Sequence, residues 1–223
     1  MKKYFFTSLV GLLCFACLAD AQVGVFVGPG FGYGPGYGRP PYARRRVQNL
    51  PPFKPTVNIS FGYGFPNLDK YALAQFNNMY QGNTTTQLGP ITGAVDYRFS
   101  RMMSIGVLVT HGKVSAPFYY YNAPATPALT GSLDNWSVML NFVRYLSAGD
   151  RVAPYIRTAI GVNTWQQNYS DGQGNKLNLG GTPDELAYQV GLGADFYLAK
   201  NAGLFIEGGY GKYILQGGLA FRF

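Results

Sequence analysis

The chain has 223 residues, of which 47% are hydrophobic, 16% are aromatic and only 13% are charged, and it contains 30 glycines. This length is enough for one domain with extensions. Low charge without a long apolar run argues against membrane-spanning helices and favours an all-β protein.

The formal net charge of +8 belongs mostly to one segment. Residues 22–55 contain five basic residues and no acid, whereas residues 56–223 contain eleven basic and nine acidic residues, a net of +2. Because the part that can fold is nearly neutral, the charge does not indicate a nucleic-acid partner.

Residues 1–21 have the features of a secretory signal peptide. Lys2 and Lys3 precede the apolar stretch at 4–18, and Ala19-Asp20-Ala21 follows it as an A-x-A cleavage site. Both cysteines lie inside the apolar stretch, so cleavage would leave a chain without disulfides or thiolate chemistry. An uncleaved anchor and a lipid-modified Cys17 are the alternatives.

Residues 22–55 contain seven glycines and seven prolines, and glycine occupies every second position from Gly28 to Gly38. Such a segment cannot build an apolar face, which predicts a disordered basic arm. A phosphate-binding glycine loop would need a Lys-Ser/Thr and a following helix, and neither is present. Arg44 to Arg46 are interpreted as a solvated charge run, with contact to anionic lipid or cell-wall polymer as the alternative.

From residue 56 onward, apolar residues alternate with small or polar ones, the period of a β-strand with two different faces. In 103–111, for example, Ile105, Val107 and Val109 share one face, and Ser104 and Gly106 lie on the other. This pattern predicts eight strands, at 57–65, 89–99, 103–111, 135–146, 152–165, 186–198, 203–210 and 213–223. Most have nine or more residues, the length that a tilted strand needs to cross a bilayer.

The predicted connections alternate in length. Tight turns at 100–102, 149–151 and 200–202 alternate with long polar loops at 67–88, 112–134 and 166–185, and a two-residue turn, Gly211-Lys212, precedes the last strand. An even strand number, with tight turns on one side and long loops on the other, is typical of outer-membrane barrels.

Aromatic residues of the apolar face gather at strand ends in two groups. The groups are Phe61, Tyr63, Trp136, Tyr188, Tyr210 and Tyr213 at the loop end, and Tyr97, Phe99, Phe196, Phe221 and Phe223 at the turn end. Two aromatic girdles are typical of a membrane-facing wall. A secreted soluble barrel with its apolar face inward is the competing interpretation, but the opposite face is rich in glycine, which suits a cramped interior better than a wet exterior.

With these features, residues 56–223 resemble the small eight-stranded outer-membrane β-barrels of the OmpA/OmpX type. The resemblance implies an all-β, antiparallel, up-and-down transmembrane barrel in the cell outer membrane, in contact with its lipids and lipopolysaccharide. It implies that the arm and the tight turns face the periplasm. It also implies that Tyr213, Phe221 and Phe223 of the last strand form an assembly signal for the outer-membrane insertion machinery.

Six charged residues, three of each sign, fall on the inner face near the turn end. They are Asp96, Arg98, Arg157, Asp195, Glu207 and Arg222. Because the interior of an eight-stranded barrel is just wide enough for side chains to fill, we predict that these six form an ionic plug.

The sequence predicts no catalytic, cofactor-binding or metal site. The chain has one histidine, His111, which ends a predicted strand on the lipid-facing side, without a neighbouring His-x-Ser pattern. We interpret it as a polar cap at the membrane interface. Neither a metal-binding cluster nor a phosphate loop is apparent.

The sequence therefore favours a non-enzymatic barrel with a role in envelope integrity or in surface contact through the long loops at 67–88, 112–134 and 166–185. The run 117–121, Pro-Phe-Tyr-Tyr-Tyr, is expected to place aromatic side chains on an exposed loop tip. The alternatives are a narrow, porin-like transport barrel for small solutes and an enzyme that modifies envelope lipids.

Overall fold

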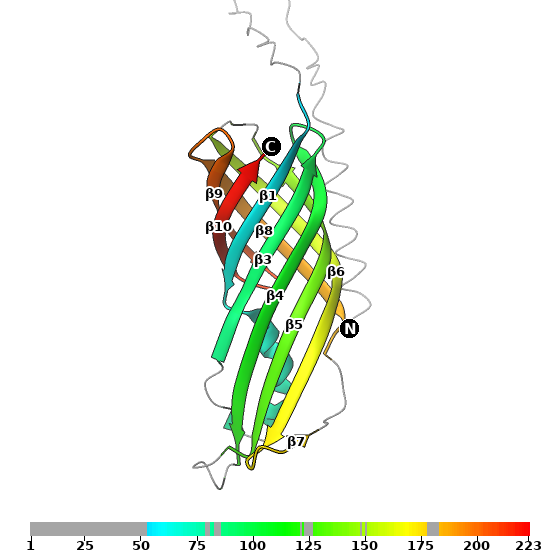
Figure 1. Cartoon of the computed structure of the whole chain (residues 1–223), viewed down its shortest axis with the longest axis vertical. Helices are drawn as coiled ribbons and strands as arrows, with labels where there is room; N and C mark the ends of the chain where they lie inside the picture. The colour runs from blue at the N-terminus through cyan, green and yellow to red at the C-terminus, as the bar shows by residue number, and fades with distance from the viewer. Residues whose placement is uncertain are drawn as a thin grey trace, which may run out of the picture. The chain divides into compact units, whose positions relative to one another are not determined.

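The computed structural model describes residues 53–78, 81–82, 86–120, 122, 127–147, 149, 151–177 and 183–223. The predicted signal peptide and nearly all of the predicted arm lie outside this part of the chain. Eight long strands form one wall (Figure 1). They are β1 (Thr56–Phe65), β3 (Thr86–Arg98), β4 (Met103–Tyr119), β5 (Leu129–Tyr145), β6 (Val152–Asp171), β8 (Leu186–Tyr197), β9 (Ala202–Tyr210) and β10 (Leu215–Arg222).

Each long strand pairs antiparallel with the next, and the sheet closes on itself. The closing pair is β1 with β10, which runs in register from Asn58 opposite Arg222 to Phe65 opposite Leu215. The predicted all-β, eight-stranded, up-and-down antiparallel barrel is therefore confirmed. Three short elements complete the described fold: the 3₁₀ helix η2 (Leu68–Asn78), β2 (Gln81–Gly82) and β7 (Lys176–Leu177). No helix in the described ranges is long and apolar enough to cross a membrane.

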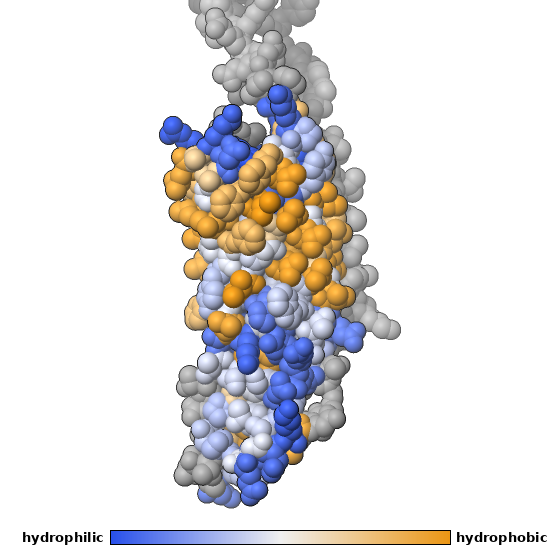
Figure 2. All heavy atoms as spheres, viewed as in Figure 1, coloured by the Kyte–Doolittle hydropathy of each residue, from blue (hydrophilic) through white to orange (hydrophobic). Residues whose placement is uncertain are grey.

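A broad apolar band surrounds the half of the barrel that carries the tight turns. Figure 2 shows this band on one face, with hydrophilic residues beyond it in both directions. On β4 the outward side chains of the band include Ile105 and Val107, which are 37% and 44% exposed. An exposed apolar surface that encircles a barrel is unfavourable in water and is the surface that lipid covers in transmembrane barrels.

Beyond the band the polarity of the two faces is exchanged. On β4 the outward residues after His111 are Lys113, Ser115 and Pro117, whereas the inward residues Val114 and Phe118 are buried. The alternation keeps its phase, because β4 and β5 pair without a register shift from Met103 opposite Arg144 to Phe118 opposite Leu129. At the tight-turn end these strands form a wall that faces the membrane. At the opposite end the same strands form a wall that faces water and surrounds an apolar interior. This water-facing part of the barrel is here called the extension.

The prediction of three long polar loops is wrong for much of their length, because the extension is built from these residues. Large parts of 112–134 and 166–185 belong to β4, β5 and β6, and 67–88 contains η2, β2 and the start of β3. The outward polar residues suggested loops, whereas many inward residues, such as Val114 and Leu133, are apolar. Phe118, expected on an exposed tip, is 2% exposed.

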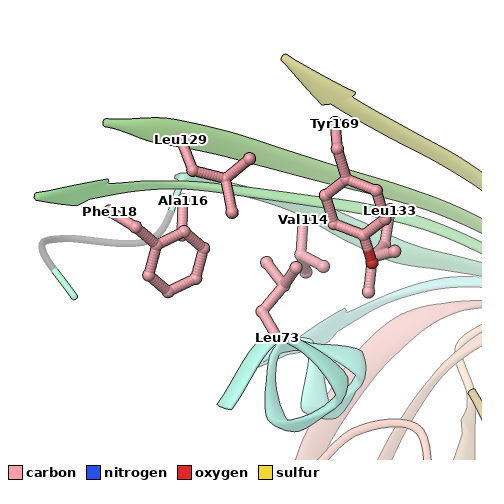
Figure 3. Packing of buried hydrophobic residues seen from close by; sticks show 7 residues of the cluster. All are labelled: Leu73, Val114, Ala116, Phe118, Leu129, Leu133 and Tyr169. Carbon is pink, nitrogen blue, oxygen red and sulfur yellow. The ribbon is translucent and has the colours of Figure 1, made fainter. Parts of the chain in front are cut away.

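Helix η2 packs against the interior of the extension. In Figure 3 Leu73 of η2 points toward side chains from β4, β5 and β6. This buried cluster consists of Leu73, Val114, Ala116, Phe118, Leu129, Leu133 and Tyr169. The extension therefore has a small hydrophobic core of its own, and burial of these apolar side chains stabilises it. We call this end of the barrel, which η2 covers, the capped end.

The closing strand differs from its prediction at its start. The connection between β9 and β10 spans four residues, not two, and the amide of Gly209 donates to the carbonyl of Ile214 over 2.7 Å. Ile214 and Leu215 are both exposed, so the simple alternation begins only at Leu215. Tyr213, predicted to face lipid in the girdle, is fully buried, and Gly64 leaves room for it, since a Cβ there would lie 2.7 Å from the Cβ of Tyr213.

The two tryptophans of the chain offer a test of the membrane boundary. Trp136 is outward and 51% exposed at the edge of the band, whereas Trp165 packs against the interior of the extension. In vesicles with brominated lipid, the fluorescence of Trp136, isolated by Trp165→Phe, should be strongly quenched. The fluorescence of Trp165, isolated by Trp136→Phe, should be nearly unaffected. Similar quenching of both would contradict the boundary.

Candidate functional site: the lumen and its capped end

The centre of the lumen holds one buried ion pair. Arg157 Nε of β6 lies 3.3 Å from Glu207 Oε2 of β9, and the two side chains are 5% and 0% exposed. Glu207 also accepts hydrogen bonds from the hydroxyls of Tyr155, over 2.9 Å, and Tyr213, over 2.8 Å. A buried carboxylate with two hydrogen-bond donors and an adjacent guanidinium is well compensated, which is the condition for burying charge at tolerable cost.

Asp96 is buried beside this pair but reaches a different partner. Its carboxylate accepts a 2.6 Å hydrogen bond from Asn141 Nδ2 of β5. It also lies within the electrostatic field of Arg157. The structure therefore brings three of the six predicted residues, Asp96, Arg157 and Glu207, into one buried polar group.

The other three contact tyrosines near the tight turns. The guanidinium of Arg98 lies 3.9 Å from the ring centroid of Tyr145, and that of Arg222 lies 4.2 Å from that of Tyr197. Asp195 accepts a long, 3.5 Å hydrogen bond from the hydroxyl of Tyr197. Of the six charges predicted to form a plug, Arg157 and Glu207 lie at ion-pair distance, whereas Arg98, Arg222 and Asp195 contact tyrosines.

The role of these tyrosines was not predicted from the sequence. Tyr145 and Tyr155 occur at inward positions of their predicted strands, so the alternation contained a signal for them. Tyr155 needs space across the lumen, and Gly193 provides it, since a Cβ there would lie 2.6 Å from the Tyr155 ring. The alternation gave no such signal for Tyr213. This residue lies in the four-residue connection before β10, where its side chain does not follow the alternation of the strand.

Two further layers of buried side chains fill the lumen. One layer consists of Ala94, Leu108, Met139, Ala159 and Ala187, and the other of Val143, Tyr145, Ala153, Tyr155 and Tyr197. Both come from inward positions of the long strands. At these levels the interior is occupied by packed side chains, as expected for eight strands.

At the capped end a second buried ion pair ties η2 to the turn before β10. Lys212 Nζ lies 2.9 Å from Asp69 Oδ1, and Asn135 Nδ2 donates to the other carboxylate oxygen over 2.9 Å. Burial lowers the pKa of Lys212, and the Asp69 carboxylate opposes this shift. The sequence predicted Lys212 only as a turn residue, because its partner is 143 residues away.

Beside this pair lies a cleft of about 470 Å³, within the size range of small-molecule sites. It is lined by residues of η2, β6, the segment before β8, β8 and the β9–β10 turn, among them Asp69, Tyr71, Trp165, Asp184, Tyr188 and Lys212. Lys212 Nζ lies 5.4 Å from the Trp165 ring centroid, and Trp165 Nε1 donates to the Asp184 carbonyl over 3.1 Å. Aromatic and charged side chains therefore line the cleft, and contacts with their neighbours hold Trp165 and Lys212 in position.

His111 lies outside the lumen, at the level where the polarity of the wall changes. Its ring stacks on Trp136, with centroids 4.3 Å apart, and its Nδ1 lies 3.4 Å from Asp134 Oδ1. Across the described ranges, no group of three or more His, Cys, Asp or Glu side chains could hold a metal ion.

The Asp69–Lys212 pair makes a testable prediction about η2. Asp69→Asn leaves Lys212 buried without its counter-charge, so local opening of η2 should become easier by about 2 kcal/mol. Amide hydrogen exchange of Leu68–Asn78 should accelerate roughly 30-fold, while exchange in β8 and β9 changes little. Lys70→Gln, in the same helix, is the matched control. Unchanged exchange in Asp69→Asn would show that the pair does not hold the helix.

No known protein family matches the sequence, and no curated protein matches it either. Several solved structures have a similar fold. A de novo designed transmembrane β-barrel is 15% identical, with a TM-score of 0.40, covering 75% of this chain and 95% of its own. Ail, the attachment invasion locus protein of Yersinia pestis, crystallised with the heparin analogue sucrose octasulfate, is 14% identical (TM-score 0.38; 76% and 97% covered). The outer membrane protein OprG of Pseudomonas aeruginosa is 7% identical (TM-score 0.40; 76% and 95% covered).

Proposed function

We propose that this protein is an outer-membrane barrel of the OmpA/OmpX-like type that holds a rigid, water-facing extension on the cell surface for contact with other molecules or cells. The tight turns and the arm face the periplasm, and the capped end faces outward. The observation that carries the proposal is the exchange of polarity along β4, β5 and β6. The apolar band suits lipid, whereas the polar wall beyond it suits water.

The extension is ordered before any partner arrives. Its strands β4 and β5 remain paired to Phe118 and Leu129, and η2 is held by the Leu73 cluster and by the Asp69–Lys212 pair. A preordered surface loses little conformational freedom on binding, which favours affinity. Tyr71, on η2 beside the cleft, is 60% exposed and suits such a contact.

The packed lumen supports a non-conducting role. Arg157, Glu207 and the two buried layers occupy the interior of the described barrel. Purified protein in planar bilayers should therefore show no sustained nanosiemens channels. Such channels would instead favour the narrow transport barrel. Changes in envelope lipid composition that depend on His111 would favour the lipid-modifying enzyme.

The surface role is tested in cells that lack the protein and produce it from a plasmid. Attachment to cultured cells and self-association should be stronger with the wild type than with an empty plasmid. Tyr71→Ser should weaken both, while Lys176→Ser, an exposed control on the same end, should not. Heat-modified gel mobility confirms that each variant is folded. Equal attachment with and without the protein would contradict the proposed role.

A further inference from the structure

The tight-turn end of the barrel carries a ring of positive charge, which we call the cationic rim. Every tight turn contributes to it, as do the segment before β1 and the end of β5. The rim consists of Lys54, Arg101, Arg144, Arg151 and Lys200, all exposed or half-buried. Among the described residues of this end no acid is exposed, since Asp195 is buried. Asp150, in the turn with Arg151, lies outside the described residues.

The opposite end of the barrel has no such excess of basic over acidic residues among the described residues. Beyond the apolar band, the described basic residues are Lys70, Lys113, Lys176 and Lys212, and the acids are Asp69, Asp134, Asp171, Asp184 and Glu185. Four basic residues thus face five acids, and some are paired, as in Lys212 with Asp69. The near-neutral barrel therefore concentrates its positive charge at one end.

The rim directly adjoins the surface that lipid covers. Arg151 precedes Val152, which is 47% exposed, and Lys200 follows shortly after Leu198, which is 80% exposed. Figure 2 shows hydrophilic residues immediately beyond the apolar band at this end. In a bilayer these cations lie at the depth of the lipid headgroups, where phosphate groups are found.

We propose that the cationic rim binds anionic phospholipid headgroups, such as those of phosphatidylglycerol, in the leaflet next to the tight turns. Zwitterionic headgroups carry a compensating positive charge, so the rim distinguishes the two classes. A basic residue near an anionic membrane surface contributes roughly a fivefold preference. The proposal rests on insertion of the barrel in a membrane and not on the proposed surface role.

The test uses the full barrel in phosphatidylcholine vesicles with a trace of spin-labelled phosphatidylglycerol or spin-labelled phosphatidylcholine. Electron paramagnetic resonance gives the relative association of the two labels with the protein. The wild type should favour phosphatidylglycerol by roughly twofold or more, averaged over both leaflets. The rim variant Lys54→Gln/Arg151→Gln/Lys200→Gln should lose most of this preference, and 1 M salt should also remove it, because the Debye length falls to about 3 Å.

The matched control, Lys70→Gln/Lys113→Gln/Lys176→Gln, removes the same number of charges from the opposite end and should keep the wild-type preference. Heat-modified gel mobility and circular dichroism establish that all three proteins are folded. A wild type without preference for phosphatidylglycerol would overturn the proposal. A rim variant that keeps the preference, or a control that loses as much, would overturn it too.

Discussion

Replacing Glu207 with alanine is expected to destabilise the barrel by about 3–5 kcal/mol, because it removes the ion-pair partner of the buried Arg157. It also removes the acceptor for the hydroxyls of Tyr155 and Tyr213, which are buried. Reversible urea unfolding in lipid vesicles, followed by circular dichroism, measures the change in the free energy of unfolding.

The double variant Arg157→Met/Glu207→Leu separates the charge from the packing. It removes both charges and keeps most of the volume, so its loss of stability should be much smaller than that of Glu207→Ala. Tyr213→Phe, which deletes one donor to Glu207 and leaves the ring, should cost about 1–2 kcal/mol. A Glu207→Ala barrel within 1 kcal/mol of the wild type would show that Arg157 has another compensating partner.

An arginine placed on the apolar band should also have a large effect. Val107→Arg puts a charge on the lipid-facing side of β4 and should cost about 2–4 kcal/mol in vesicles. Ser115→Arg is the matched control, because Ser115 lies on the same strand and the same face, beyond His111. It should change stability by no more than about 0.5 kcal/mol. The same unfolding experiment measures both variants.

Equal losses in the two arginine variants would mean that lipid covers β4 as far as Ser115. Equal, negligible losses would mean that lipid does not cover Val107. Either result would contradict the membrane boundary at the level of His111 and Trp136.

Much of the wall was predictable, because strand alternation is a local property. Ile105, Val107 and Val109 indicate a lipid-facing side without any knowledge of neighbouring strands. The ends of β4, β5 and β6 were not predicted, since Lys113, Asp134 and Gln166 look like loop residues when polarity alone is considered. Their neighbours Val114, Leu133 and Trp165 continue the alternation on the inner face.

The sequence predicted which residues of the candidate site lie on the inner face of the barrel, but it did not predict which of them contact each other. The inward positions of Arg157 and Glu207 follow from strand alternation, but their contact depends on how β6, β8 and β9 are staggered around the barrel. The pairing of Lys212 with Asp69 depends on where η2 enters the capped end. Tyr213 was assigned to the wrong face because a four-residue connection interrupts the alternation before β10.

The sequence by itself determined that the chain after residue 56 forms eight strands with one apolar face, which side chains of the band point into the lumen apart from Tyr213, and where tight turns occur. These features follow from a period of two residues and from short-range turn chemistry. Only the tertiary structure decided which inward residues meet, that the extension has its own core, and that η2 is held over it. Those outcomes depend on closure and stagger of the sheet, which join residues far apart in the chain and leave no local pattern.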